Sequence, residues 1–393
     1  MKRERFDVVV AGVGGMGSAA VDHLARRGRR VLGLERFDVP NDMGSSHGYT
    51  RIIRLAYYEH SSYVPLLRRA YELWRELESA AAEQLLHVTG SIDAGPEGSL
   101  VFDGSLRSCL DHGLEHEVVG AGELRRRYPG YRLPPETVAV IQPEGGFLLP
   151  ERCIVAHVER AQAAGAEVRA RERVLEWEPT SEGGVRIRSD RAVYEAERLV
   201  LTAGAWTADL AGLGASIVVA ERQVLAWLQP RRPELFAPAR FPVFNLVAPE
   251  GRYYGFPVFA VPGFKFGRYH HLEEHVDPDD VDREPRPHDE EVLRDFAERY
   301  FPDGAGPTMT LKVCLFENSP DEHFLLDLHP EHEQVVIAAG FSGHGFKFCS
   351  VIGEIAADLA LEGSTPHDIG FLRLARLTAT GRGVPTGRVE GEG

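Results

Sequence analysis

The chain has 393 residues, of which 43% are hydrophobic and 26% are charged, and its formal net charge is −15 at pH 7. This composition is ordinary for a globular protein, and the length predicts two or three structural units, or two interleaved ones. The negative charge argues against nucleic acid as a partner, and no apolar run approaches the ~18 residues of a membrane span, so we expect a cytoplasmic protein outside the membrane.

The N-terminal segment has the pattern of a dinucleotide-binding turn. FDVVVAG predicts a buried strand, MGSAAVDHLARRG a helix, and VLGLE a second strand. Gly12, Gly14 and Gly17 have the G-x-G-x-x-G spacing that lets a pyrophosphate approach the helix N-terminus. Glu35 ends the second strand, where an acid binds ribose hydroxyls, and Arg36 beside it is expected to be an exposed arginine. The motif alone does not choose between NAD and FAD.

Helices and strands continue to alternate along the middle of the chain. Apolar residues at helical spacing predict a helix over 62–79, followed by short strands, one further helix, and a helix after Pro150. A small meander then returns to the apolar strand LVLTAG, with a helix after Trp206. From about 216 to 316, strands rich in aromatic residues and proline, with one helix, predict a second unit with its own sheet.

A second strand, glycine turn and helix follow near the C-terminus. QVVIAAG predicts the strand, FSGHGFK the turn, and FCSVIGEIAADLALEG the helix. A glycine turn before a helix presents backbone N–H groups to an anion, although such a turn can equally be a simple connection.

Lysine and cysteine are both rare. Four of the 44 basic residues are lysines, and Lys347 lies in the second glycine turn. An ammonium is compact and its pKa shifts readily, so a lysine in an arginine-rich chain can mark a place where arginine would not serve. The four cysteines, Cys109, Cys153, Cys314 and Cys349, are far apart, which indicates neither a zinc cluster nor a disulfide framework.

Seven motifs occur in order along nearly the whole chain: GVGGMGSAA, GSSHGYTRIIRLAY, LTAGAW, YYGFP, GFKFG, PDEHFLLDLHPEH and AAGFSGHGFKF. Together they resemble the monomeric sarcosine oxidase family of D-amino-acid oxidase-type flavoproteins, with N-methyltryptophan oxidase and pipecolate oxidase as near relatives. The resemblance implies an α/β fold with a Rossmann-type FAD-binding domain built from discontinuous segments, and a smaller α+β substrate domain with a mostly antiparallel sheet. The FAD-binding domain is expected to comprise residues 1–85, 150–215 and 317–378. The substrate domain is expected to comprise 86–149 and 216–316, and a flexible tail is expected over 379–393.

The resemblance also implies how the cofactor is held. The family's linking cysteine matches Cys314, so a thioether from Cys314 to the flavin 8α-methyl carbon is expected. The other residues expected to contact FAD are Gly12, Gly14, Gly15, Met16, Gly17, Glu35, Arg36, Ser45, Ser46, Thr50, Arg51, Val174, Ala203, Gly204, Trp206, Gly343, Gly345, Phe346 and Lys347.

Two basic residues match the family positions that hold the substrate carboxylate. These are Arg54 and Lys347, which would orient the substrate amine toward the flavin. Arg51 matches a residue near the flavin ring. Lys265 matches the family lysine that assists the reaction with oxygen. A nearby cation has this effect because it stabilises the superoxide formed in the first electron transfer.

The segment KFGRYHH has one residue more than the family pattern, so either Tyr269 or His270 could fill the family's histidine position, with His270 assigned provisionally. Neighbouring His270 and His271 would point to opposite faces of an extended segment, so we expect no metal site. Phe316 stands where sarcosine oxidases have a tyrosine, and Tyr49 replaces an acid. With Tyr254 and Phe256, Phe316 forms an aromatic cluster that could favour a larger N-substituent.

The expected activity is oxidation of an N-methyl or cyclic secondary amino acid, most simply sarcosine, by a monomer that uses O2. Pipecolate, N-methyltryptophan and a fructosyl amino acid are alternative substrates. A dehydrogenase that uses a protein electron acceptor and a flavin-binding module without turnover are alternatives of other classes. Lys265 argues against the dehydrogenase, and the presence of Arg54 and Lys347 argues against the module.

Overall fold

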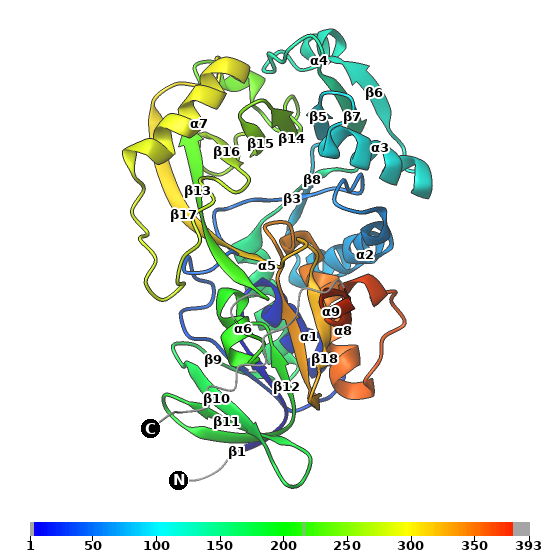
Figure 1. The fold of residues 1–393 in the computed structure, drawn as a ribbon, viewed down its shortest axis with the longest axis vertical. Coiled ribbons are helices and arrows are strands. Elements are labelled where there is room, and N and C mark those ends of the chain that lie inside the picture. The colour runs from blue at the N-terminus through cyan, green and yellow to red at the C-terminus, as the bar shows by residue number, and fades with distance from the viewer. Residues whose placement is uncertain (1–3, 215–216, 380–393) are drawn as a thin grey trace.

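The computed structural model describes residues 4–214 and 217–379, which form two large sheets with a small sheet between them (Figure 1). The first large sheet has a parallel centre in the order β9-β2-β1-β12-β19, and β18 is antiparallel to β19 at one edge. Strand β11 is antiparallel to the first half of β12, and β10 is antiparallel to β11. Its strands are β1 (Glu4–Ala11), β2 (Val31–Leu34), β9 (Glu167–Arg169), β10 (Val174–Pro179), β11 (Val185–Ser189), β12 (Val193–Leu201), β18 (Leu325–His329) and β19 (His332–Ala339).

Three helices pack against this sheet, α1 (Gly15–Arg26), α5 (Pro150–Ala163) and α8 (Cys349–Glu362), and α2 (Val64–Ala81) packs against α5 and α8. Helix α1 packs against both α5 and α8 because its facing residues are small: a Cβ added to Gly353 of α8 would lie 2.5 Å from Ala19. Buried Asp22 of α1 lies 2.7 Å from His157 Nδ1 of α5 and also binds Arg160. These contacts fix the helix whose N-terminus forms part of the site.

The second large sheet has the order β17-β13-β16-β15-β14-β5-β7-β6, and every neighbouring pair is antiparallel except β14 and β5. Aromatic side chains such as Phe244, Phe264 and Phe301 form its core. Its strands are β5 (Ser91–Gly95), β6 (Glu117–Gly120), β7 (Val138–Gln142), β13 (Val219–Leu228), β14 (Val243–Ala248), β15 (Gly251–Phe256), β16 (Phe264–Arg268) and β17 (Thr308–Asn318).

Short elements connect the two sheets. The small sheet has the order β3 (Arg51–Ile53), β8 (Gly146–Leu148), β4 (Leu86–Val88). The remaining elements are α3 (Leu100–His112), α4 (Ala121–Arg127), α6 (Thr207–Leu210), α7 (Pro287–Tyr300), α9 (Ala375–Ala379) and the 3-10 turns η1 (Ser61–Tyr63), η2 (Gly204–Trp206), η3 (Pro233–Leu235), η4 (Phe346–Phe348) and η5 (Gly370–Leu372).

The predicted α/β architecture with a second, mostly antiparallel sheet is confirmed. One expectation was wrong: two helices, α3 and α4, lie between α2 and Pro150 where one was expected. Helix α4 has seven residues, of which only Leu124 is buried, so its apolar periodicity is weak. The tail expected over 379–393 lies outside the described residues except for Ala379, which ends α9. Among the residues described, none of the helices is long and apolar enough to span a membrane.

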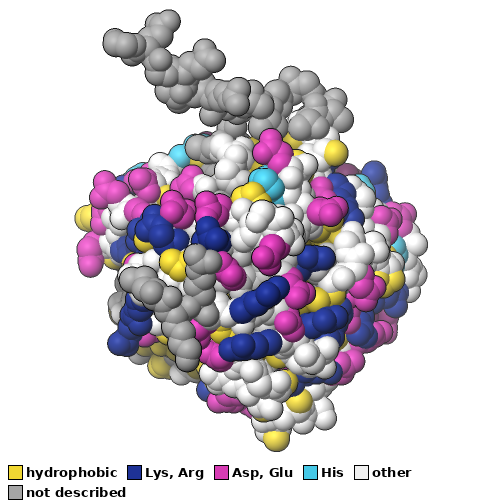
Figure 2. Space-filling view, turned by 90° about the horizontal axis from the view of Figure 1, so that it is seen from below, with side chains coloured by type: hydrophobic (Ala, Val, Ile, Leu, Met, Phe, Trp, Pro, Cys, Tyr) yellow, Lys and Arg dark blue, Asp and Glu magenta, His cyan; other side chains and the backbone are white. Residues whose placement is uncertain are grey.

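Figure 2 shows one face of the molecule, on which basic and acidic side chains are interspersed. Several exposed arginines in the described chain lie beside carboxylates, as Arg188 does beside Glu176 and Arg186 beside Glu178. Such pairs are typical of a solvated surface.

Candidate active site

A single cavity is bordered by both glycine turns and by residues of the second large sheet. The first turn contributes Gly12, Gly14, Gly15 and Met16, and the second contributes Gly343–Lys347. Strands β14, β15 and β17 contribute Asn245, Tyr254, Phe256, Cys314 and Phe316. The cavity therefore lies where the two sheet units meet.

The first turn is shaped to accept a ligand. Gly12 has φ +94°, and a Cβ there would lie 2.6 Å from Thr202 O, so only glycine fits without strain. Nothing lies within 4 Å of a Cβ built on Gly14, and no side chain caps the N-terminus of α1, so its first N–H groups are free for an anion. Glu35 accepts hydrogen bonds from Val13 N at 2.8 Å and Phe37 N at 3.0 Å. Burial raises the pKa of Glu35.

At the end of the cavity next to Glu35, a loop from the unit with the second large sheet contacts the unit with the first large sheet. Asp279 accepts a hydrogen bond from Trp206 Nε1 at 2.6 Å and forms ion pairs with Arg36 and, at 3.2 Å, with Arg173. Asp277 and Pro278 border the cavity as well. The loop therefore closes the side of the cavity next to Glu35.

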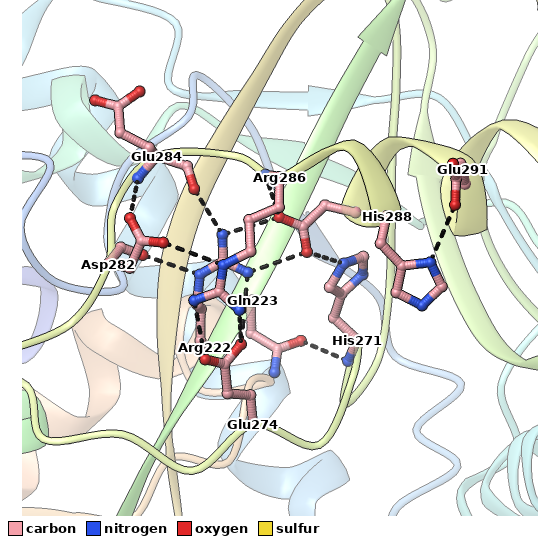
Figure 3. A network of polar contacts seen from close by, with 10 residues as sticks. Arg222, Gln223, His271, Glu274, Asp282, Glu284, Arg286, His288 and Glu291 are labelled. Carbon is pink, nitrogen blue, oxygen red and sulfur yellow. Dashed lines mark hydrogen bonds and ion pairs between the residues drawn. The ribbon is translucent and has the colours of Figure 1, made fainter.

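A buried polar network fixes both ends of this loop (Figure 3). Arg222, on β13, donates to both carboxylate oxygens of Asp289 at 3.0 and 2.9 Å and to the carbonyls of Asp282 and Glu284. His271 Nε2 lies 2.9 Å from Asp289 Oδ1. Arg222, His271 and Asp289 have fully buried side chains, so the segment from His271 to Asp289 is held at both ends.

Cys314 borders the cavity and is buried, and burial raises the pKa of its thiol. Its Sγ lies 3.8 Å from the Arg51 guanidinium, which also donates to Ser45 O at 2.6 Å and Thr50 O at 3.0 Å. A cation beside a thiol favours the thiolate, which is the nucleophilic form.

Arg54 and Lys347 both border the cavity and are almost fully buried. Arg54 is paired with Glu59 at 2.7 Å and lies 3.8 Å from Asp93. Lys347 Nζ donates to His344 O at 2.7 Å, and burial lowers its pKa to about 7. Burial alone would raise the pKa of Glu59, but Arg54, His344 and Lys347 lower it to about 2. The site is therefore a compact group of charges with two cations facing the cavity.

Lys265 lies behind the cavity wall. Its Nζ donates to Gly48 O at 2.8 Å, Thr50 O at 2.7 Å and Thr50 Oγ1 at 3.0 Å. Its neighbours across the sheet are Phe256, whose ring centroid is 4.1 Å from Nζ, and Trp227, at 5.5 Å. Burial lowers its pKa well below the ordinary lysine value.

Of the two candidates for the family's histidine position, Tyr269 borders the cavity and His270 does not. His270 has φ +53°, and its ring binds Glu221 at 2.8 Å and Glu322 at 3.2 Å, which raise its pKa to about 9. Tyr269 lies 5.3 Å from the Tyr254 ring and 5.6 Å from the Phe316 ring. A Cβ on Gly343 would lie 2.4 Å from the Phe316 ring, so any larger residue at 343 would displace this ring.

Most of the predicted site residues border the cavity; Gly17, Thr50, Lys265 and His270 do not. Gly17 still has a local role, because a Cβ there would lie 1.8 Å from Gly12 O. No sequence motif indicated that Asn245, Asp279 or Glu317 would border the cavity. Burial raises the pKa of Glu317 to about 8, and no hydrogen bond reaches its Oε2 from the described residues. In the described chain, no group of three or more His, Cys, Asp or Glu is placed to bind a metal.

The dinucleotide turn, the parallel sheet and the adjoining cavity define an α/β nucleotide-cofactor protein. Residues 7–359 match the model of the FAD dependent oxidoreductase family, and the chain belongs to this family. It is 41% identical over 380 residues to the monomeric sarcosine oxidase of Streptomyces avermitilis, covering 95% of this chain and 98% of that one. It is 33% identical to the N-methyl-L-tryptophan oxidase of Yersinia pestis, covering 94% and 99%.

Among solved structures it is similar to NikD, an unusual amino acid oxidase essential for nikkomycin biosynthesis. The TM-score is 0.81 at 30% identity, and the likeness covers 94% of this chain and 97% of NikD. The residues present fit FAD, because the uncapped N-terminus of α1 and the open space beside Gly14 suit a pyrophosphate, and a carboxylate at the position of Glu35 suits ribose hydroxyls.

Proposed function

We propose that this protein oxidises secondary amino acids, with sarcosine as the simplest substrate and O2 as the acceptor. Sarcosine, oxygen and water would give glycine, formaldehyde and hydrogen peroxide. The observation that carries the proposal is that two buried cations, Arg54 and Lys347, border the same cavity as the first glycine turn and Cys314. A small carboxylate is the ligand such a pair favours. The activities named for the sarcosine and N-methyl-L-tryptophan oxidases support the reaction class.

FAD, when bound, supplies the acceptor for the two electrons removed from the substrate. Arg54 and Lys347 bind the carboxylate and so orient the amine. Tyr254, Phe256 and Phe316 form aromatic walls that exclude water from the reacting amine. Lys265, held by three oxygen acceptors, supplies a fixed positive charge for oxygen reduction.

We assign FAD binding to residues 1–85, 150–215 and 317–378, and substrate binding to 86–149 and 216–316. The two large sheets support this division, because their strands come from the corresponding segments, apart from the last two residues of β17, which pass the boundary at 316. We place the protein in the cytoplasm as a monomer that acts on small molecules. All four cysteines are free and buried, as is common in a reducing compartment.

The test is peroxide release in air by the FAD-loaded protein, with sarcosine, pipecolate, N-methyltryptophan and a fructosyl amino acid at equal concentrations. We expect peroxide with sarcosine to be strongest. Stronger release with pipecolate or N-methyltryptophan would move the substrate to a larger amino acid, and no release with any of them would overturn the proposal.

We further propose that FAD is attached covalently through Cys314. Replacement of Cys314 with serine should therefore release all flavin from acid-denatured protein, whereas the wild-type protein should retain it. Cys349→Ser is the matched control, because Cys349 is also buried but does not border the cavity. Retention of flavin by acid-denatured Cys314→Ser would show that another atom forms the link, and release of all flavin by the wild-type protein would show that there is no covalent link.

The affinity for a simple carboxylate should fall as pH rises through the pKa of Lys347, about 7. Only protonated Lys347 attracts the ligand, so binding of acetate should weaken by up to about tenfold per pH unit between about pH 7 and 8.5. The pKa of Glu59, about 2, and that of His344, about 4, lie outside this range, whereas that of the cavity residue Glu317, about 8, lies inside it, so Glu317→Gln should keep the part of the dependence that belongs to Lys347. Acetate titrations followed by flavin absorbance measure the dependence. It should disappear in Lys347→Met, and its persistence there would assign the titration to another group.

A further inference from the structure

Three side chains lie in a row across the cavity face of the second large sheet. Asn245 of β14 is in register with Asp93 of β5 on one side and with Tyr254 of β15 on the other. Residues paired in register project from the same face of a sheet. Asn245 and Tyr254 border the cavity, whereas Asp93, at one end of the row, has no exposed surface and does not border it.

The orientation of the Asn245 amide is fixed from behind. Its Nδ2 donates to Asp93 Oδ1 at 2.6 Å. Asp93 also accepts from Ser105 Oγ at 2.9 Å and lies 3.8 Å from Arg54 Nε. A carboxylate beside an arginine accepts hydrogen bonds, so the amide nitrogen faces Asp93 and the amide oxygen faces away. Asp93 is therefore a positioning residue for Asn245.

The amide oxygen of Asn245 has no donor among the described residues. No hydrogen bond within the described ranges reaches Oδ1, and the residue is 2% exposed, so the cavity is the only space this oxygen can address. The oxygen is therefore open to the cavity, where a ligand that brings a hydrogen-bond donor pairs with it in place of water. The same part of the cavity holds Arg54, whose guanidinium is next to Asp93.

We propose that Asn245 is a specificity-determining residue whose Oδ1 accepts a hydrogen bond from a hydroxyl or N–H on a substituent of the substrate. This inference rests on the proposed oxidation of secondary amino acids and narrows its substrate class. Among amino acids of equal size, those with a second hydrogen-bond donor beside the reacting amine are preferred over apolar analogues. A site that hydrogen-bonds a substrate group discriminates against the analogue that lacks it.

The test uses substrate pairs that differ only by a hydroxyl in place of a methyl group. N-methylserine and N-methyl-2-aminobutyrate place the difference on the α side chain, and N-(2-hydroxyethyl)glycine and N-propylglycine place it on the nitrogen substituent. We expect wild-type kcat/KM to favour the hydroxyl compound of at least one pair by about tenfold. The preference should fall to within about twofold in Asn245→Leu, whatever happens to kcat/KM for sarcosine, because any general loss of activity cancels within a substrate pair. Equal rates within both wild-type pairs, or a preference that survives in Asn245→Leu, would overturn the proposal.

A binding measurement separates this inference from the proposed function. Titration of the FAD-loaded protein with 3-hydroxypropionate and with butyrate, followed by flavin absorbance, requires no turnover. Tighter binding of the hydroxy acid to the wild type, but not to Asn245→Leu, would support Asn245 even if no amino acid were oxidised. Equal binding of the two acids to the wild type would count against it. If Asn245→Leu fails to bind FAD, Asn245→Val removes the same oxygen with a smaller side chain suited to a strand.

Discussion

Replacement of Lys265 with methionine is expected to slow the reaction of the reduced protein with oxygen by at least about 100-fold. Anaerobic reduction by the substrate should stay within about threefold of wild type, because Lys265 does not border the cavity in which we propose that the substrate binds. Stopped-flow measurement of the two half-reactions separates these effects.

The reason is electrostatic. The first electron transfer to oxygen makes superoxide, and a fixed cation in a site that excludes water stabilises this anion. Gly48 O, Thr50 O and Thr50 Oγ1 accept all three ammonium protons, which favours the charged form against the burial that lowers the Lys265 pKa. Because the folded pKa is lowered, the rate of reoxidation should fall as pH rises through that pKa, and Lys265→Met should remove this dependence.

Lys312→Met is the matched control. Lys312 is another of the four lysines, lies on β17, and is 39% exposed. The Lys312→Met substitution should leave the rates of both half-reactions nearly unchanged. An equal fall in both half-reactions of Lys265→Met would instead mean that Lys265 supports the packing of Phe256 and Trp227 and has no special role toward oxygen.

The parts of the site that the sequence predicted are local in the chain. Gly12, Gly14 and Glu35 belong to one strand–helix–strand unit, so spacing alone places them together. The second turn, including Lys347, is likewise a short segment between a strand and a helix. Cys314 was placed by its resemblance to a family motif, because nothing in its immediate neighbours distinguishes it from a buried structural cysteine.

The residues that the sequence did not predict depend on register and long-range contact. Asn245 and Asp93 are 152 positions apart, and Asp279 and Arg36 are 243 apart. Neither pair has a local pattern. The choice between Tyr269 and His270 depended on one backbone conformation: His270 adopts a positive φ after β16, which turns its ring toward Glu221 and leaves Tyr269 at the cavity.

Replacement of Arg222 with leucine is expected to lower the free energy of unfolding by about 3–5 kcal/mol. Arg222 has a fully buried side chain that gives two hydrogen bonds to Asp289 and one each to the carbonyls of Asp282 and Glu284. Its loss leaves a buried carboxylate without its cation and two carbonyls without donors. Urea unfolding of the FAD-loaded protein measures the change.

The double variant Arg222→Leu/Asp289→Leu should recover part of this stability, because an apolar pair replaces a lone buried charge. The recovery is expected to be incomplete, since Asp289 also accepts a hydrogen bond from Arg286 N at the start of α7. Arg286→Leu removes an exposed arginine of the same network and should have a much smaller effect. A loss below about 1 kcal/mol in Arg222→Leu would contradict the assignment of Arg222 as the anchor of this network. The segment that Arg222 anchors contains Asp279, which contacts Arg36 and Trp206 at the cavity. If Arg222 is the anchor, the Arg222→Leu protein should also bind FAD more weakly than the Arg286→Leu protein.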